Sequence, residues 1–186
     1  IYDDFVERSA ARAKSLKIGN PADPDTQHGP QVDEATFHKV LGYIEKGKKE
    51  GARLVTGGSR FGSSGFYVQP TVFADVTDEM TIAKEEIFGP VQSILKFSSL
   101  EEALERANAT NYGLGAGIFT RDLQTALQFA KHVEAGNVWV NNYMIMGAQI
   151  PFGGFKESGI GRENGKDSLE EYLEVKTVII DLPKNF

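Results

Sequence analysis

The sequence lacks cysteine altogether, and it lacks any long hydrophobic run. None of the 186 residues is a cysteine, so these residues hold no disulfide, no thiolate metal site and no cysteine nucleophile. No stretch approaches the roughly 18 apolar residues that a membrane span needs, and residues 1–5 (IYDDF) are not a signal peptide. We therefore expect a soluble chain without a membrane partner. Because helical patterning begins at once, without an initiator methionine, we also expect a piece of a longer protein.

Basic residues are in short supply. Lys and Arg number 20 against 26 Asp and Glu, giving a net charge of -6, whereas nucleic-acid binding needs a basic face. The sequence thus predicts no nucleic-acid partner. With 40% hydrophobic and 25% charged residues, the composition is that of an ordinary globular protein with a sizeable core.

The first half of the chain alternates helix and strand patterns. Apolar spacing predicts an amphipathic helix over the first ~17 residues, then a proline-rich irregular loop over 20–31. A second helix follows Asp33, a candidate N-cap, and stops at Gly51. Strands are predicted at residues 54–56, 66–73 and 91–97.

The second half continues the alternation. A capping box of Ser98 and Glu101 predicts a helix start, and Asp122 caps a second helix. Strands are predicted at 115–120 and 138–140. The expected buried stripes of the two helices are Leu100, Ala103, Leu104 and Ala107, and then Leu123, Ala126, Leu127 and Ala130.

This order predicts an α/β fold with an open, mostly parallel sheet covered by helices on both faces. We divide the chain into residues 1–163 and a terminal part, residues 164–186. The terminal part is expected to hold a short helix near 165–172 and a strand over 173–182. Because that strand turns apolar on both faces at residues 178–180, it should pair with another segment or subunit rather than remain an open edge.

Most candidate chemical groups of the sequence have ordinary structural interpretations. The three histidines show no paired spacing, so no metal site or catalytic triad is predicted. Ser158 lacks the glycine elbow of a hydrolase nucleophile. The glycine-rich stretch 152–162 has neither P-loop nor Rossmann spacing, so phosphate binding and a close backbone approach at a turn are both open.

Segment 84–90 (KEEIFGP) is a stronger candidate for a ligand site. It places two carboxylates beside an aromatic ring, between strand signals and before a rigid Gly-Pro pair. A carboxylate can accept hydrogen bonds from ribose hydroxyls, and a phenyl ring can pack on a flat heterocycle. From the residues alone, dinucleotide binding and a solvated turn are equally open.

Four separated motifs resemble the C-terminal third of an NAD(P)-dependent aldehyde dehydrogenase. They are KEEIFGPV at 84–91, NYGL at 111–114, GNVWVN at 136–141 and PFGGFKESG at 151–159. The resemblance extends over the whole chain and is greatest to the tetrameric cytosolic and mitochondrial branch.

The resemblance implies specific roles for individual residues. Glu86 would bind the nicotinamide ribose and Phe88 would pack beside the nicotinamide. An apolar substrate entrance would be lined by Tyr143, Met146 and Phe152. Glu163 matches a carboxylate assigned to proton relay, with pairing to a neighbouring cation as the equal alternative.

In relatives the carbonyls of Lys156 and Gly159 match a potassium site, but we assign no metal ligand here.

The family reaction implied by this resemblance oxidises an aldehyde to a carboxylic acid through a cysteine thiohemiacetal and thioester, with NAD, or alternatively NADP, as hydride acceptor. The cysteine, the general-base glutamate and the Rossmann segment would precede this chain. We therefore expect the isolated chain to be inactive. Its partners would be the upstream portion, the aldehyde and further subunits in a homodimer or homotetramer, in cytoplasm or mitochondrial matrix. A crystallin-like structural protein and a separate binding or assembly module are the alternatives.

Overall fold

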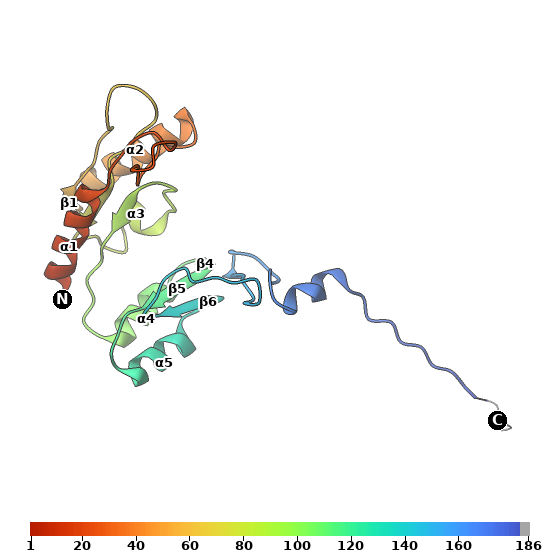
Figure 1. Ribbon diagram of the computed structural model, residues 1–186. Helices are drawn as coiled ribbons and strands as arrows, with labels where there is room; N and C mark the ends of the chain where they lie inside the picture. The colour runs from red at the N-terminus through yellow and green to blue at the C-terminus, as the bar shows by residue number, and fades with distance from the viewer. Residues whose placement is uncertain (183–186) are drawn as a thin grey trace. The chain divides into compact units, whose positions relative to one another are not determined.

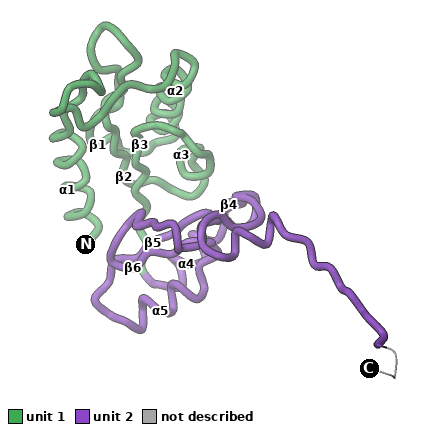
Figure 2. Tube along the Cα trace, turned by 45° about the vertical axis from the view of Figure 1, so that its right-hand side comes forward, with its two compact units in different colours: residues 1–98 green, residues 99–186 purple. Residues whose placement is uncertain are grey.

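The computed structural model describes residues 1–182. The chain divides into two compact units, Ile1–Ser98 and Ser99–Phe186 (Figure 2), and each is described by itself. Residues 183–186, the end of the predicted terminal part, lie outside the described residues.

Unit 1 is built from three helices and a three-stranded sheet (Figure 1). The strands lie in the order β1-β2-β3, with β1 antiparallel and β3 parallel to the central β2. The elements are α1 (Tyr2–Ser15), α2 (Glu34–Lys49), β1 (Arg53–Thr56), β2 (Thr71–Ala74), α3 (Thr81–Lys84) and β3 (Val91–Ser93).

Both faces of the central strand β2 are buried, because a helix covers each of them. Val72 and Ala74 belong to a cluster with Val6 of α1. Phe73, which points to the opposite face, belongs to a second cluster with Val40 and other residues of α2. The predicted cover of helices on both faces is thus found on this sheet. The capping prediction is confirmed as well, since the Asp33 side chain accepts from the Thr36 N–H at 2.7 Å.

The predicted strand over 66–73 is wrong in extent, because regular pairing begins only at Thr71. Within residues 66–70, Val68 forms an isolated bridge with Arg60. Gly57, which follows β1, has a φ of 73° and lies against Pro70. A Cβ atom at Gly57 would lie 2.3 Å from the Pro70 carbonyl oxygen, so this close approach requires glycine. Helix α3 was not expected, because four residues are too few to show a helical period.

Unit 2 contains a parallel pair of strands joined through a helix, as the sequence predicts. Strand β5 pairs with β6 in parallel register, from Gly115↔Asn137 to Ile118↔Val140. A second, antiparallel pair joins β4 and β7. The elements are α4 (Leu100–Asn108), β4 (Tyr112–Gly113), β5 (Gly115–Ile118), α5 (Leu123–His132), β6 (Asn137–Val140), β7 (Phe155–Lys156) and the 3₁₀ helix η1 (Asp167–Tyr172).

The predicted start of α4 is displaced by one residue. The N-cap is Ser99, whose hydroxyl accepts from the Glu102 N–H at 3.1 Å, rather than Ser98 with Glu101. Either serine is a competent cap. Leu100 and Leu104 of the predicted stripe contact the core of unit 2, whereas Ala107 is exposed.

The predicted buried stripe of α5 is wrong apart from Ala126. Phe129 and Val133 are buried with it, whereas Leu123 and Leu127 are 72% and 62% exposed. Helices α4 and α5 pack against one face of the β5-β6 pair, through Ala116, Ile118 and Val138. Both residue sets have helical spacing, so the period alone does not distinguish them.

The fold class is α/β, and the described residues form three small sheets. Two strand pairings are parallel and two are antiparallel, so within residues 1–182 the sheets are not one continuous, mostly parallel sheet. The short helix predicted near 165–172 is present as η1. Residues 174–182 are exposed and have no strand partner among the described residues. No helix among residues 1–182 is both long and apolar enough to cross a bilayer.

Thr71 gives a first test of the packing, because it is a buried polar residue of the core. Its Oγ1 accepts from the Gly58 N–H at 2.9 Å and donates to the Gln69 carbonyl at 2.7 Å. Thr71→Val keeps the shape but leaves both groups unpaired, so the free energy of unfolding should fall by about 1–3 kcal/mol. Urea denaturation measures this change.

A matched control uses Thr26, whose Oγ1 is buried and has no hydrogen-bond partner among the described residues. Thr26→Val loses no hydrogen bond, so its unfolding free energy should stay the same or rise. Equal losses in the two variants would contradict the assignment.

A second test concerns Asp75, which ties α1 and β1 to the end of β2. Its carboxylate accepts from Arg53 Nε at 2.6 Å and from the Tyr2 hydroxyl at 3.0 Å. The bond from Arg53, followed by that from Tyr2, lowers the pKa of Asp75 below its ordinary value. This stabilisation is complete above about pH 5 and is lost as pH falls through the lowered pKa.

Asp75→Asn suits the positive φ of 56° at this position but removes the charge. The variant should unfold at lower urea than the parent at pH 7, and the difference should vanish toward pH 2. Glu105→Gln is the control, because Glu105 is exposed on α4 and its side chain forms no hydrogen bond or ion pair among residues 1–182. A difference independent of pH would show that the charge of Asp75 is not responsible.

Candidate functional site

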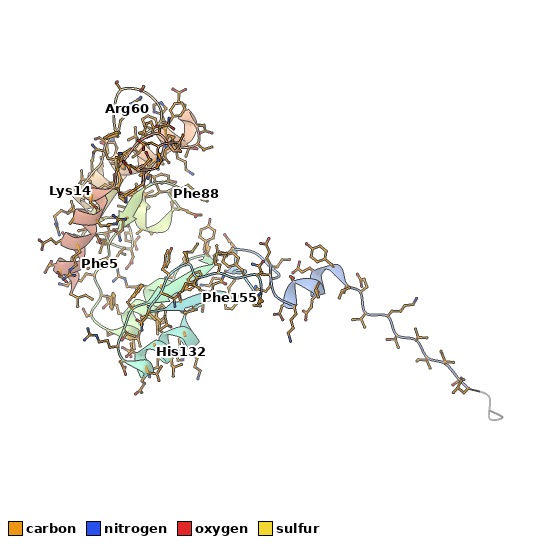
Figure 3. The ribbon with its side chains drawn as sticks, in the orientation of Figure 1. Phe5, Lys14, Arg60, Phe88, His132 and Phe155 are labelled. Atoms are coloured by element: carbon orange, nitrogen blue, oxygen red, sulfur yellow. The ribbon has the colours of Figure 1, made fainter. Side chains whose placement is uncertain are left out.

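One buried apolar side chain, that of Ile87, anchors segment 85–90 to the core of unit 1. Ile87 is 8% exposed and belongs to the core cluster of α2 and β2. Its two neighbours are exposed, and Phe88 is 70% accessible. Figure 3 shows the labelled Phe88 side chain on the segment that follows α3. Burial of Ile87 therefore presents the Glu86 carboxylate and the Phe88 ring at the surface of unit 1.

Two backbone features fix this presentation. Phe88 has a φ of 55°, a left-handed conformation that is uncommon for a bulky residue and is enriched at functional sites. A Cβ atom on Gly89 would lie 2.5 Å from Val40 Cγ2, so glycine permits the segment to lie directly against α2. The Pro90 carbonyl accepts from the Thr71 N–H at 2.8 Å, which joins the segment to β2.

Helix α2 adds two polar residues that the sequence analysis missed. The Tyr43 hydroxyl donates to Glu85 Oε2 at 2.7 Å, and this bond raises the pKa of Tyr43. Lys39 Nζ lies 6.0 Å from the centre of the Phe88 ring and 5.8 Å from that of Tyr43. Lys39 and Tyr43 are four residues apart, so the predicted helix places them on one face. This spacing is the sequence signal that could have identified them.

The two adjacent glutamates therefore differ. Glu85 is engaged by Tyr43, whereas Glu86 is exposed and has no hydrogen bond or ion pair among the described residues. Of the pair, Glu86 is the carboxylate that is free to accept hydrogen bonds from a ligand. Glu86 is also the residue that the resemblance selected.

A pocket of about 180 Å³ in unit 2 includes two of the three predicted substrate residues, Met146 and Phe152. The third, Tyr143, packs against Trp139, with ring centres 5.8 Å apart and planes at 60°. Trp139 forms part of the pocket wall, and its Nε1 donates to the Ile145 carbonyl at 3.0 Å. The sequence analysis places Trp139 in a strand and in the GNVWVN motif but does not assign it to the substrate entrance, so it missed this pocket residue.

Glu163 lies beside Phe152 through the backbone. The Phe152 N–H donates to the Glu163 carbonyl at 2.8 Å, and the Glu163 N–H donates to the Phe152 carbonyl at 2.7 Å. The Glu163 side chain is exposed and has no ion pair among the described residues.

The glycine-rich stretch is a set of close backbone approaches. A Cβ atom on Gly136 would lie 2.0 Å from the Gly153 carbonyl oxygen, and one on Gly154 would lie 2.5 Å from Ser158 Cβ. The Ser158 hydroxyl accepts from the Gly113 N–H at 3.0 Å. Of the two open interpretations, the structure supports the turn.

Metal-binding side chains do not gather in the described part of the chain, where no group of three or more His, Asp or Glu residues could hold an ion. The histidines lie apart. His132 Nδ1 is 2.8 Å from the Gln128 carbonyl oxygen of its own helix, and His38 is 3.7 Å from Glu34.

Known proteins match the chain over almost its whole length. The family model described as "Aldehyde dehydrogenase family" matches residues 1–178. The human protein "Aldehyde dehydrogenase, mitochondrial" is 58% identical over 184 residues, 99% of this chain. The rabbit (Oryctolagus cuniculus) "Aldehyde dehydrogenase 1A1" is 56% identical over 182 residues, 98% of this chain.

A solved structure gives the same result. The NAD+ complex of aldehyde dehydrogenase from Bacillus cereus superposes with a TM-score of 0.95 at 48% identity, covering 98% of this chain. The chain spans 36% of the human relative, 37% of the rabbit relative and 37% of the Bacillus cereus chain.

The family expectation is thus confirmed by sequence and by fold. A family model over residues 1–178 and identities above half of all positions leave one assignment: this chain belongs to the aldehyde dehydrogenase family.

Proposed function

We propose that the chain forms the C-terminal third of an NAD-dependent aldehyde dehydrogenase, which oxidises an aldehyde to a carboxylic acid. The observation that carries the proposal is the Glu86-Ile87-Phe88 arrangement, in which a buried isoleucine presents a free carboxylate and an exposed ring. A relative of the same family, the Bacillus cereus enzyme, has been solved as an NAD+ complex.

The residues of unit 1 would hold the nicotinamide end of the cofactor. The Glu86 carboxylate can accept hydrogen bonds from both ribose hydroxyls, and the Phe88 ring can pack beside the flat nicotinamide. When bound, NAD supplies the hydride acceptor of the oxidation. NADP remains the alternative, because the 2′-phosphate that distinguishes the two lies at the adenosine end, away from these contacts.

The residues of unit 2 would receive the substrate. Tyr143, Met146 and Phe152 provide an apolar surface around the Trp139 pocket, which suits a hydrophobic aldehyde. Glu163, exposed at the edge of the same loop, would serve as a proton relay. No residue here supplies a thiolate, so the 186 residues alone should show no dehydrogenase activity.

The finer architecture belongs to this proposal as well. Residues 1–163 would complete an open, mostly parallel sheet of the catalytic domain together with an upstream portion. Residues 173–182, exposed and without a partner strand in the described part of the chain, would pair across subunits in a dimer or tetramer. The compartment would be the cytoplasm or the mitochondrial matrix, and the human relative is named as mitochondrial.

A chimera tests the proposal directly. The 36% of human mitochondrial aldehyde dehydrogenase that this chain matches is replaced by these 186 residues. NADH formation with acetaldehyde should appear in the chimera and be absent from the isolated chain. The truncated human protein without the replacement is the control.

Turnover by the isolated chain would refute the fragment assignment. A folded but inactive chimera would instead favour the alternatives, a structural protein of crystallin type or a binding module. Titration of the isolated chain with NAD would separate these two.

A matched pair of variants in the chimera tests the cofactor contact. Glu86→Gln should raise the KM for NAD by roughly tenfold or more, as expected when a charge-assisted hydrogen bond is lost. Glu85→Gln should change it by less than about threefold, because Glu85 is engaged by Tyr43 and not by the ligand. Equal effects would remove the distinction between the two carboxylates.

A further inference from the structure

The loop of residues 152–163 carries one predicted substrate residue at its start and Glu163 at its end. The two backbone hydrogen bonds between Phe152 and Glu163, at 2.8 and 2.7 Å, close the base of this loop. The positions of the Phe152 ring and the Glu163 carboxylate are therefore coupled. A contact that holds the loop in place therefore also holds the Phe152 ring and the Glu163 carboxylate.

The far end of the loop is held by the side chain of Lys156. Its Nζ donates to the Asn108 carbonyl at 2.7 Å and to the Thr110 carbonyl at 3.1 Å, and lies 2.5 Å from Glu134 Oε2. Three acceptors match the three N–H donors of an ammonium group. The Lys156 side chain is only 27% exposed, compared with 53% for Glu134, so the lysine is the more enclosed partner.

The backbone at Lys156 adopts a conformation that the local sequence disfavours. Its φ is 53°, in the left-handed region, which is unfavourable for L-residues with a Cβ atom. Such conformations persist where surrounding contacts over-determine them, and they gather at functional sites. The hydrogen bonds and ion pair of Lys156 Nζ with its three acceptors are the contacts that hold this backbone conformation.

The acceptors of Lys156 come from two helix ends that are themselves tied together. Asn108, the last residue of α4, donates from Nδ2 to the His132 carbonyl at 2.9 Å. Its Oδ1 accepts from the Glu134 N–H at 2.8 Å. Lys156 thus attaches the loop to a rigid junction of the C-terminal ends of α4 and α5, and the adjoining β4-β7 pairing continues that attachment.

We propose that Lys156 is a positioning residue: its contacts with Glu134 and the Asn108 and Thr110 carbonyls set the placement of Phe152 and Glu163. This inference rests on the proposed function for its effect on the reaction. Its structural part stands independently, because it concerns the order of the loop base.

The structural part is tested by amide hydrogen exchange at Phe152 and Glu163 in the 186-residue chain. Lys156→Met should speed exchange at both amides by roughly tenfold, as the loss of charge-assisted bonds predicts. Lys156→Gly should speed exchange at both amides by a similar factor. Glycine adopts a positive φ freely, so this variant removes the ammonium group without leaving a strained backbone. Lys156→Arg, which keeps a charged donor, should restore most of the protection.

The matched control is Lys131→Met, on an exposed position of α5, which should leave both exchange rates unchanged. Unchanged exchange in Lys156→Met and Lys156→Gly would overturn the positioning role. Faster exchange throughout unit 2, without preference for the loop base, would also overturn it and would show that Lys156 serves general stability.

The functional part is tested in the active chimera. Lys156→Met should raise the KM for the aldehyde by roughly tenfold, while the KM for NAD stays within about twofold, because the contacts of Lys156 are with Asn108, Thr110 and Glu134 and not with the cofactor segment. Lys156→Arg should recover the aldehyde KM. Parallel changes in both KM values, or none, would overturn the role in the reaction. An inactive parent chimera would count against the proposed function alone, and the exchange results would still decide the placement of the loop.

Discussion

Burial of both faces of strand β2 is the constraint on which unit 1 depends. Val72 faces the cluster of α1 and Phe73 faces that of α2, so one four-residue strand is shared by two hydrophobic clusters. Burial of an aliphatic or aromatic side chain of this size stabilises a fold by about 1.5–3 kcal/mol. Without the strand, neither amphipathic helix would have an apolar surface to cover.

The candidate cofactor segment depends on the same core. Ile87 joins the cluster that contains Phe73, and the Pro90 carbonyl is bonded to the Thr71 N–H of β2. Because Ile87 fixes the centre of the segment and Pro90 fixes its end, Phe88 can be held in a left-handed conformation that it would not adopt in a free peptide. A site built on a rigid core needs little reorganisation when a ligand binds.

Unit 2 achieves order by a different means, because few of its residues are fully buried. Close backbone contacts at glycines, such as that of Gly136 with the Gly153 carbonyl, and the polar anchoring of Lys156 replace a large apolar core. Such contacts are directional, so they fix loops as well as helices. Several apolar side chains stay exposed here, including Leu123 and Leu127 of α5, and these are the positions where helical periodicity predicted the wrong face.

The sequence by itself determined the family, the α/β class and most helix limits, and it predicted part of the candidate site, including Glu86 and Phe88. These depend on local signals: the cap at Asp33, the spacing of apolar residues and the motifs that carry the resemblance. Tertiary structure alone decided which of two competent serines caps α4, which glutamate of the pair is engaged, and that Trp139 lines a pocket. Those choices depend on contacts between residues far apart in the chain, whose energies no local pattern of the sequence records.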